Sequence, residues 1–270
     1  MLDEESHREV AFFIGADYCM NVPRQSAMSK TNIGELKMKD HKYLEKRKEV
    51  EAYFTTKNIR PSPEQIVQSP SGSFELKIYE VVTGTGAWEY TLGIVKNLHT
   101  GSVVCKIKRN FSHFWYAWVQ HKNGYEYLLC GEDYQGYSVL NLSTEAYHSY
   151  FPEEGHDGIG FCWADVHPSP DGLVLAVDGC YWGCPYELVI FDFKTPEALP
   201  LLEISRFSDL DVCQGWLDSQ TFAFTRTVLK RKADGQPYER LSEQEQVVLH
   251  ADIDLACEVV EKQIFQRDIK

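Results

Sequence analysis

Three cysteines and a histidine that lie close together in the sequence have the clearest potential for chemistry. Three residues separate Cys180 from Cys184, and a hairpin predicted after Val166 would bring Cys162 near Cys180. Together with His156 they could bind zinc, which prefers thiolate and imidazole ligands, or two of the thiols could form a redox disulfide. Structural zinc sites usually carry paired Cys-x2-Cys knuckles, and buried cysteine is commonly a small apolar residue. We therefore expect no metal and no cofactor, and keep Cys162, Cys180 and Cys184 as the candidate ligands.

Acidic side chains are the second set with chemical potential. Glu132, Asp133 and Asp178 lie at or after the ends of predicted strands in neighbouring repeats. Paired carboxylates about 5–9 Å apart catalyse glycoside hydrolysis, but nothing in the sequence fixes that separation. The chain also lacks a Gly-x-Ser-x-Gly elbow and a Gly-Lys-Ser/Thr phosphate loop. A non-catalytic role is the leading interpretation, and a hydrolase that uses carboxylates or a metal is the alternative.

The distribution of charge argues against a nucleic-acid partner. The net charge is −13, yet residues 1–60 hold 11 basic and 10 acidic residues, and the remaining 210 residues hold 16 and 30. An acidic body repels phosphate backbones. No apolar run approaches the roughly 18 residues of a membrane helix, and the charged first residues do not resemble a secretory signal. Eight cysteines without such a signal favour reduced thiols, so we expect a cytoplasmic protein that binds neither membrane nor nucleic acid.

Four copies of one motif must position these side chains. Tight turns recur at 69–72, 121–124, 169–172 and 217–220, at intervals of 52, 48 and 48 residues. The first three turns end in glycine, which adopts the positive φ that hairpins require. A repeat of this length with regularly spaced turns is typical of an array of small β-sheets.

Alternating apolar and polar residues follow each turn, as at Phe74, Leu76 and Ile78, and indicate a strand with one buried face. We predict four antiparallel strands in every repeat; in the last repeat the third and fourth fall at 246–253 and 258–266. The predicted fold is all-β: a four-bladed β-propeller-like array of four-stranded antiparallel sheets with an N-terminal helical extension. The domain covers 61–270, with repeats at about 61–110, 111–153, 154–207 and 208–268.

The third turn carries a family resemblance. Its sequence, Ser169-Pro170-Asp171-Gly172 followed by Leu-Val-Leu-Ala, resembles the hairpin of WD40-like and TolB-like propellers, and residues 69–72 are similar. The likeness extends over about residues 61–268. The Trp-Asp pair that closes WD40 repeats is missing. The resemblance therefore implies a propeller architecture and no particular activity, because propellers host unrelated functions.

Residues 1–60 do not fit the repeat. Apolar residues between 35 and 56 fall on one helical face with Lys and Glu between them, which predicts an amphipathic helix that docks on or caps the sheets. Residues 10–15 could add a strand, and Pro61-Ser62-Pro63 marks the boundary. In an alternative arrangement the four repeats form an open curved array whose edges this segment or a second copy covers. We expect a monomer.

The repeat also predicts where a binding site lies. Strands alternate in direction, so the loops between second and third strands share an end of the molecule with the loops between repeats, opposite the tight turns. These loops combine glycine, aromatic and acidic residues; aromatics provide contact area and carboxylates provide charge. The alternative is that the aromatics only pack sheets together. We predict that this end binds a protein partner or a small polar or cationic ligand through nine residues: Trp88, Glu132, Asp133, Tyr134, His156, Asp157, Asp178, Tyr181 and Trp182.

Overall fold

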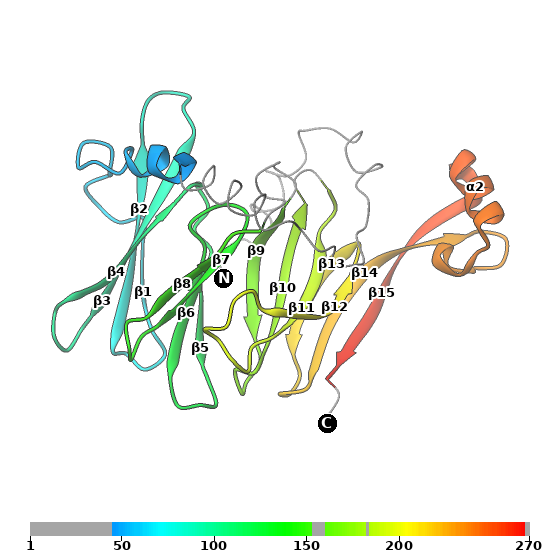
Figure 1. Ribbon diagram of the computed structural model, residues 1–270. Coiled ribbons are helices and arrows are strands. Elements are labelled where there is room, and N and C mark those ends of the chain that lie inside the picture. The colour runs from blue at the N-terminus through cyan, green and yellow to red at the C-terminus, as the bar shows by residue number, and fades with distance from the viewer. Residues whose placement is uncertain (1–44, 153–159, 182–183, 268–270) are drawn as a thin grey trace, which may run out of the picture.

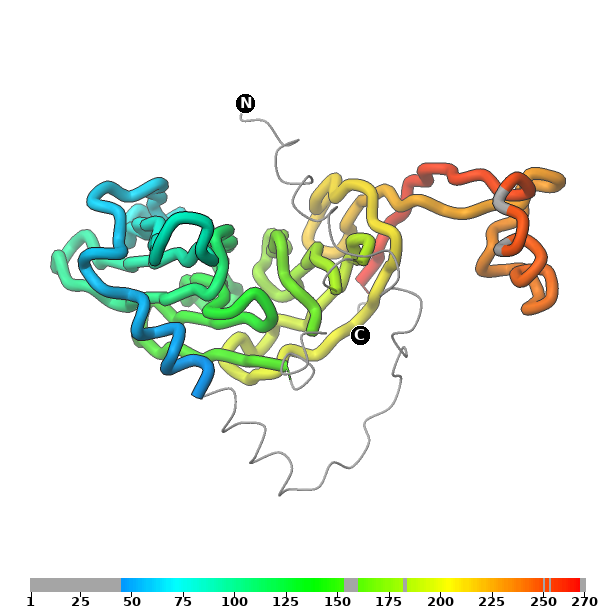
Figure 2. The backbone as a smooth tube through the Cα atoms, turned by 90° about the horizontal axis from the view of Figure 1, so that it is seen from above, coloured from blue at the N-terminus to red at the C-terminus, as the bar shows by residue number. Residues whose placement is uncertain are grey.

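Four antiparallel sheets stand side by side in chain order in the computed structural model, which describes residues 45–152, 160–181 and 184–267 (Figures 1 and 2). Neighbouring strands of each sheet are also neighbours in sequence, so every sheet is a simple meander. The predicted all-β, propeller-like class is confirmed. No helix in the described ranges has both the length and the apolar composition needed to cross a bilayer.

Strand positions follow the repeat. The first sheet consists of β1 (Gln65–Gln68), β2 (Phe74–Val82), β3 (Glu89–Asn97) and β4 (Val103–Arg109). The second consists of β5 (Ala117–Gln120), β6 (Glu126–Cys130), β7 (Tyr137–Asn141) and β8 (Tyr147–Tyr150). The third consists of β9 (Phe161–Pro168), β10 (Val174–Tyr181), β11 (Glu187–Asp192) and β12 (Leu202–Phe207). The fourth has three strands: β13 (Leu210–Trp216), β14 (Thr221–Arg231) and β15 (Ala256–Gln266).

The turns use the glycines as predicted. Gly72, Gly124 and Gly172 have φ of 69°, 88° and 68°, a region that side chains with a Cβ rarely occupy. The two Ser-Pro turns share a further contact, in which the serine hydroxyl accepts a hydrogen bond from the first amide of the following strand. A Cβ on Gly172 would also lie 2.6 Å from the carbonyl oxygen of Gln120, so this turn packs directly against the second sheet.

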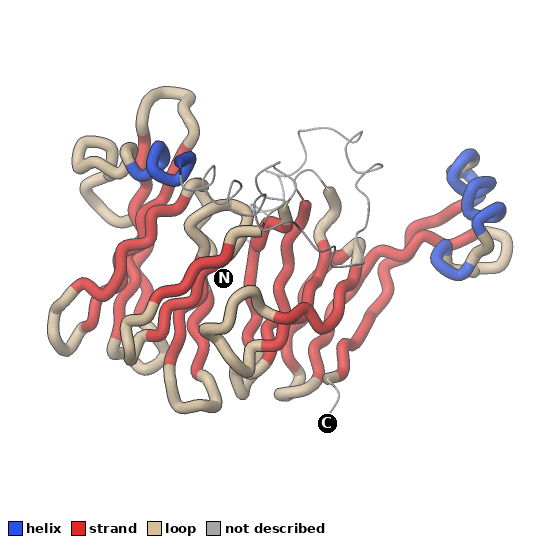
Figure 3. The backbone as a smooth tube through the Cα atoms, viewed as in Figure 1, coloured by secondary structure: helices blue, strands red, loops and turns tan. Residues whose placement is uncertain are grey.

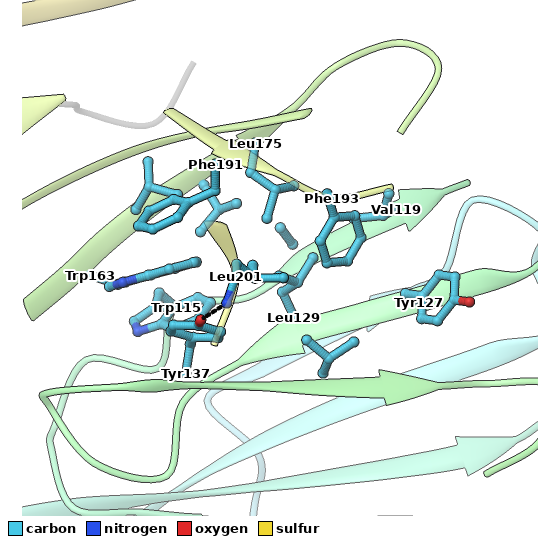
Figure 4. Packing of buried hydrophobic residues seen from close by; sticks show 14 of the residues in the cluster. Trp115, Val119, Tyr127, Leu129, Tyr137, Trp163, Leu175, Phe191, Phe193 and Leu201 are labelled. Atoms are coloured by element: carbon cyan, nitrogen blue, oxygen red, sulfur yellow. Dashed lines mark hydrogen bonds between the residues drawn. The ribbon is translucent and has the colours of Figure 1, made fainter. Parts of the chain in front are cut away.

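Apolar clusters fill the spaces between successive sheets. The cluster between the second and third sheets contains a column of aromatic rings (Figure 4). The ring centroids of Tyr137 and Trp163 are 4.3 Å apart, and Trp163 lies 5.1 Å from Phe191. The Leu201 amide donates a 2.6 Å hydrogen bond to the Tyr137 hydroxyl. Burying aromatic area of this size is a principal source of stability between the sheets.

The fourth repeat differs from the prediction. Residues 246–253, expected to be its third strand, lie mostly in helix α2 (Glu243–Ala251), and β15 pairs directly with β14. A capping box starts the helix: the Ser242 hydroxyl accepts from the Glu245 amide, and the Glu245 carboxylate accepts from the Ser242 amide. This local signal outweighs the short apolar run that suggested a strand. The helix and the flanking 3-10 turns η5 (Tyr238–Arg240) and η6 (Ile253–Leu255) form the tip of the long β14–β15 hairpin (Figure 3).

The N-terminal helix is confirmed in part. Residues 45–51 are helical and lie at the first sheet, whereas the helix ends before the predicted residue 56 (Figure 1). Val50 joins an apolar cluster with Val81, Tyr90 and Leu92 on the outer face of that sheet. The rest of the predicted helix and the predicted strand at 10–15 lie outside the described residues.

The apolar clusters of the described residues join the first sheet to the second, the second to the third and the third to the fourth. The outer face of the fourth sheet carries Val212, Val260 and Ile264, each at least 42% exposed. Within the described ranges the four sheets therefore form an open array.

Candidate functional site

An aromatic patch lies on the loops where the first two sheets meet. Trp88 comes from the β2–β3 connection, Phe111 from the segment after β4, and Tyr134 from the β6–β7 connection. Their ring centroids are 5.7 Å (Trp88–Phe111), 6.5 Å (Trp88–Tyr134) and 6.4 Å (Phe111–Tyr134) apart. Trp88 remains 46% exposed. We call Trp88, Phe111 and Tyr134 the aromatic patch. Two of its members, Trp88 and Tyr134, are among the predicted binding residues.

A buried arginine supports this patch. Arg109, at the end of β4, is 1% exposed and donates hydrogen bonds to the carbonyl oxygens of His113 (2.6 Å), Gly131 (3.0 Å) and Asp133 (2.7 Å). Its guanidinium lies 5.8 Å from the Phe111 ring centroid. Burial lowers the pKa of Arg109 to about 10, and the Asp133 carboxylate opposes that shift. The guanidinium stays charged at neutral pH and holds the β6–β7 loop of the second sheet against the first sheet.

Two predicted acidic residues have internal partners. Asp133 is 7% exposed, and its carboxylate accepts hydrogen bonds from the Asn110 side-chain amide (3.2 Å) and the Gln135 backbone amide (3.4 Å). The Glu132 carboxylate accepts from the Tyr147 hydroxyl at 3.2 Å and lies 3.7 Å from Arg47 Nε. Both carboxylates therefore position their loop; whether they also contact a ligand stays a prediction.

The helix at residues 45–51 docks on the same loop. Arg47 donates to the Glu132 carbonyl oxygen at 3.1 Å and to the Lys108 carbonyl oxygen at 2.5 Å. The Arg47 side chain is only 9% exposed. The predicted dock of the N-terminal helix is thus a specific contact made by one arginine across the first two sheets.

The remaining predicted residues belong to the third sheet or lie outside the described ranges. Tyr181 packs against Phe161 at 5.6 Å, with the Arg206 guanidinium 5.7 Å from its centroid. Asp178 lies within β10 opposite Asp165. Burial raises the pKa of Asp178 to about 6, and the charge of Asp165 adds to the shift. His156, Asp157 and Trp182 are outside the described residues.

Within the described ranges, the structure does not group the donor atoms of the three candidate cysteine ligands, and their role as metal ligands stays a prediction. Cys162 and Cys180 are Cα partners in the β9–β10 ladder, where burial raises their thiol pKa values to about 12 and 11 and so disfavours the thiolate that binds metal. Cys184 is disulfide-bonded, contrary to the expectation of reduced thiols. Among the described residues, the donor atoms that come together are those of His167, Asp178 and Cys213, all within 4.8 Å of one another.

Sequence reasoning missed several of these residues. Arg109 ends a strand that is rich in lysine, a composition typical of an exposed strand. The aromatic residues that follow are the sequence feature that could have indicated its burial. His167-Pro168 directly precedes the tight turn at residues 169–172, and the position of His167 in the sequence gives no sign of a metal site. Cys213 lies in a different repeat from His167, and single-sequence spacing cannot show that the third and fourth sheets bring the two together.

A surface hollow lies at the opposite, tight-turn end of the molecule. Its volume is about 370 Å³, and it is formed at the junction of the first two sheets. The lining includes Ser71, Gln120, Tyr125 and Glu126, and the Ser71 hydroxyl donates to Glu126 at 2.6 Å. This hollow is the alternative to the aromatic patch as a binding surface.

The fold and these sites define an all-β, propeller-like scaffold with aromatic residues on its loop end. No protein-family model matches the chain. The chain is 39% identical over 144 residues to an uncharacterized protein of Acanthamoeba polyphaga mimivirus, a match that covers 53% of this chain and 56% of the viral protein. The matched segment therefore spans little more than half of that relative.

Solved structures give only distant likenesses. A functionally unknown protein from Desulfotomaculum acetoxidans aligns with a TM-score of 0.39 and 12% identity, over 64% of this chain and 53% of its own. The Swd1 β-propeller domain of Myceliophteria thermophila aligns with a TM-score of 0.37 and 15% identity, over 74% and 54%. A putative 6-phosphogluconolactonase from Bacteroides uniformis reaches 0.33 and 13%, over 74% and 56%. These values are too low to carry an argument about function.

Proposed function

We propose that this chain is a non-catalytic recognition scaffold that binds a protein partner through the aromatic patch. The observation that carries the proposal is the exposure of Trp88, which is 46% exposed although Phe111 and Tyr134 surround it. Large aromatic residues on a rigid support are the usual energetic centres of protein interfaces. Arg109 and Arg47 supply that rigid support through hydrogen bonds to the carbonyl oxygens of the β6–β7 loop.

The partner is expected to present a basic or apolar side chain to the patch. The body of the chain, from residue 61 on, has a formal charge of −14, which attracts basic partners over long range. An arginine or lysine can stack on the exposed tryptophan ring. The hydrolase alternative draws less support, because the carboxylates of Glu132 and Asp133 face internal donors. A cytoplasmic location and a monomeric state stay predictions.

The test compares two exposed aromatic residues at opposite ends of the molecule. Trp88 is 46% exposed on the loop end, and Tyr125 is 45% exposed at the tight-turn hollow. Tagged wild-type protein, Trp88→Ala and Tyr125→Ala are used to capture partners from cells of the native source, with quantitative mass spectrometry. A partner that binds wild type and Tyr125→Ala but loses at least tenfold with Trp88→Ala supports the proposal. A partner lost only with Tyr125→Ala would move the binding surface to the hollow and overturn it.

A further inference from the structure

Three potential metal ligands meet between the third and fourth sheets. His167 comes from β9, Asp178 from β10 and Cys213 from β13. One nitrogen, one oxygen and one sulfur from these side chains lie within 4.8 Å of one another. The sheet explains the first two: Asp178 is the Cα partner of Asp165, and His167 follows Asp165 by two residues, so all three share a face.

Two of these side chains carry a polar atom that lacks the partners buried polar atoms normally have. His167 Nε2 and Asp178 Oδ1 are buried, and neither has a hydrogen-bond partner among the described residues. Buried polar atoms are nearly always hydrogen-bonded, and an exception calls for a specific explanation such as a bound ion. The Asp165 carboxylate is close to this group, but its Oδ2 lies 3.9 Å from His167 Nε2, beyond hydrogen-bond distance.

Contacts between the third and fourth sheets hold His167 in place. The Trp216 indole donates a 2.8 Å hydrogen bond to the His167 carbonyl oxygen, and the His167 ring lies 5.7 Å from that of Phe222. Both contacts connect β9 with the fourth sheet, so the donors are held between two packed layers rather than on a mobile loop.

We propose that His167, Asp178 and Cys213 bind a zinc ion that ties the third sheet to the fourth. An imidazole, a carboxylate and a thiolate are a ligand set that suits zinc, whereas magnesium and calcium prefer oxygen alone. Tetrahedral zinc with bonds of about 2.0–2.3 Å places its ligands roughly 3.5 Å apart, so donors that lie within 4.8 Å of one another need to approach by at most about 1.3 Å. Asp165, whose side chain is 62% exposed, can turn its Oδ2 in as a fourth ligand, or water completes the site.

Binding has a defined proton balance. The Cys213 thiol loses its proton to solvent as the sulfur–zinc bond forms, while His167 binds as neutral imidazole through Nε2 and Asp178 as carboxylate. No electrons are transferred. The site is independent of the aromatic patch, which lies between the first and second sheets, so failure of either proposal leaves the other intact.

Metal titration of the full chain tests the proposal. Protein freed of metal with EDTA and kept free of oxygen, without a reductant that would open the disulfide of Cys184, is titrated with zinc against a chromophoric chelator, and separately with cobalt(II). We expect one equivalent of zinc to bind, and cobalt to give both tetrahedral d–d bands and a thiolate-to-cobalt charge-transfer band. Cys213→Ser and His167→Gln should each weaken zinc binding at least tenfold, and Cys213→Ser should remove the charge-transfer band.

A matched thiol provides the control. Cys162 lies on the same strand as His167 and is also partly buried, so Cys162→Ser should leave affinity and cobalt spectrum unchanged. Far-UV circular dichroism shows whether each variant folds. If Cys213→Ser does not fold, Asp178→Asn takes its place in the zinc titration. Binding of much less than one equivalent, or equal binding by wild type and the folded ligand variants, would overturn the proposal. So would dependence on Cys162 rather than Cys213.

Discussion

The junction between the first and second sheets and the junction between the third and fourth sheets both bury polar side chains, but they treat them differently. At the first junction Arg109 is 1% exposed and meets three backbone carbonyl oxygens. At the second junction His167 Nε2 and Asp178 Oδ1 are buried without a hydrogen bond among the described residues. A polar group between sheets stabilises the array only where its partners are supplied. The buried charge of Arg109 at the first junction has its partners, although the Trp118 indole Nε1 there has none among the described residues, whereas the two unpartnered atoms of the second junction belong to side chains that can bind a metal ion.

Removing the arginine from the first junction should have the largest effect. Arg109→Met leaves the carbonyl oxygens of Gly131 and Asp133 buried without their donor. We expect the free energy of unfolding to fall by about 3–5 kcal/mol, as when one partner of a buried charged network is deleted. Urea unfolding followed by tryptophan fluorescence measures it. Lys106→Met, on the exposed side of the same strand, should change stability by less than about 0.5 kcal/mol. A similar small loss with Arg109→Met would contradict the comparison.

Removing a charge from the second junction should raise the free energy of unfolding, the opposite of the effect expected at the first junction. The pKa of Asp178 in the folded chain, about 6, lies above its ordinary value of 3.8 because burial disfavours the carboxylate. The folded state therefore binds this proton more tightly than the unfolded state. The resulting stabilisation is complete below pH 3.8 and is lost as the pH rises through 6. Asp178→Asn retains the uncharged form at every pH, so in EDTA at pH 7.5 it should raise the free energy of unfolding by about 2 kcal/mol.

The control for this prediction removes a charge elsewhere on the neighbouring sheet. Glu258→Gln changes an exposed carboxylate of β15 and should leave both stability and its pH profile unchanged within about 0.5 kcal/mol. If Asp178→Asn destabilises the metal-free protein at neutral pH, the interactions of the carboxylate with His167 and with the backbone amides of Asp165 and Asp178 outweigh the cost of its burial. The contrast between the two junctions would then disappear.

The sequence predicts the array well where local signals and tertiary packing agree. The first three turns and their flanking strands lie within a few residues of the prediction, because glycine at positive φ and alternating apolar residues both act locally. The fourth repeat fails for a local reason as well. Ser242 and Glu245 form a capping box, a stronger determinant than the short apolar run at residues 247–249.

The site was less predictable because its contacts join different repeats. Trp88 and Tyr134 were placed on one end by strand parity, and the structure brings their rings to 6.5 Å. Parity says nothing about burial, however. Asp133 was expected to present charge and instead is 7% exposed and hydrogen-bonded to Asn110. Which side of a loop residue faces the protein depends on the neighbouring sheet, and one repeat alone does not encode it.

A moderate effect should come from the helix that covers the first junction. Arg47→Met removes hydrogen bonds to the carbonyl oxygens of Glu132 and Lys108 but keeps the apolar stem. We expect a loss of about 1.5 kcal/mol, together with faster amide hydrogen exchange in residues 45–54. Lys48→Met, one residue further along the helix and exposed, is the matched control. Unchanged exchange in Arg47→Met would show that Val50 and its apolar neighbours hold the helix without the arginine.

The smallest effect on stability should come from the residue with the largest proposed role in binding. Trp88 is 46% exposed, and its indole makes only a long 3.4 Å hydrogen bond to the Asn110 carbonyl oxygen. Trp88→Ala should therefore cost less than about 1 kcal/mol, whereas Trp115→Ala, which empties a 3% exposed position in the core, should cost about 3–5 kcal/mol. Parallel urea titrations of the two variants give both numbers. A small loss with Trp88→Ala is the result that the proposed role of Trp88 in binding another molecule requires. If Trp88→Ala proved as damaging as Trp115→Ala, the patch would be part of the first junction's packing rather than a binding surface.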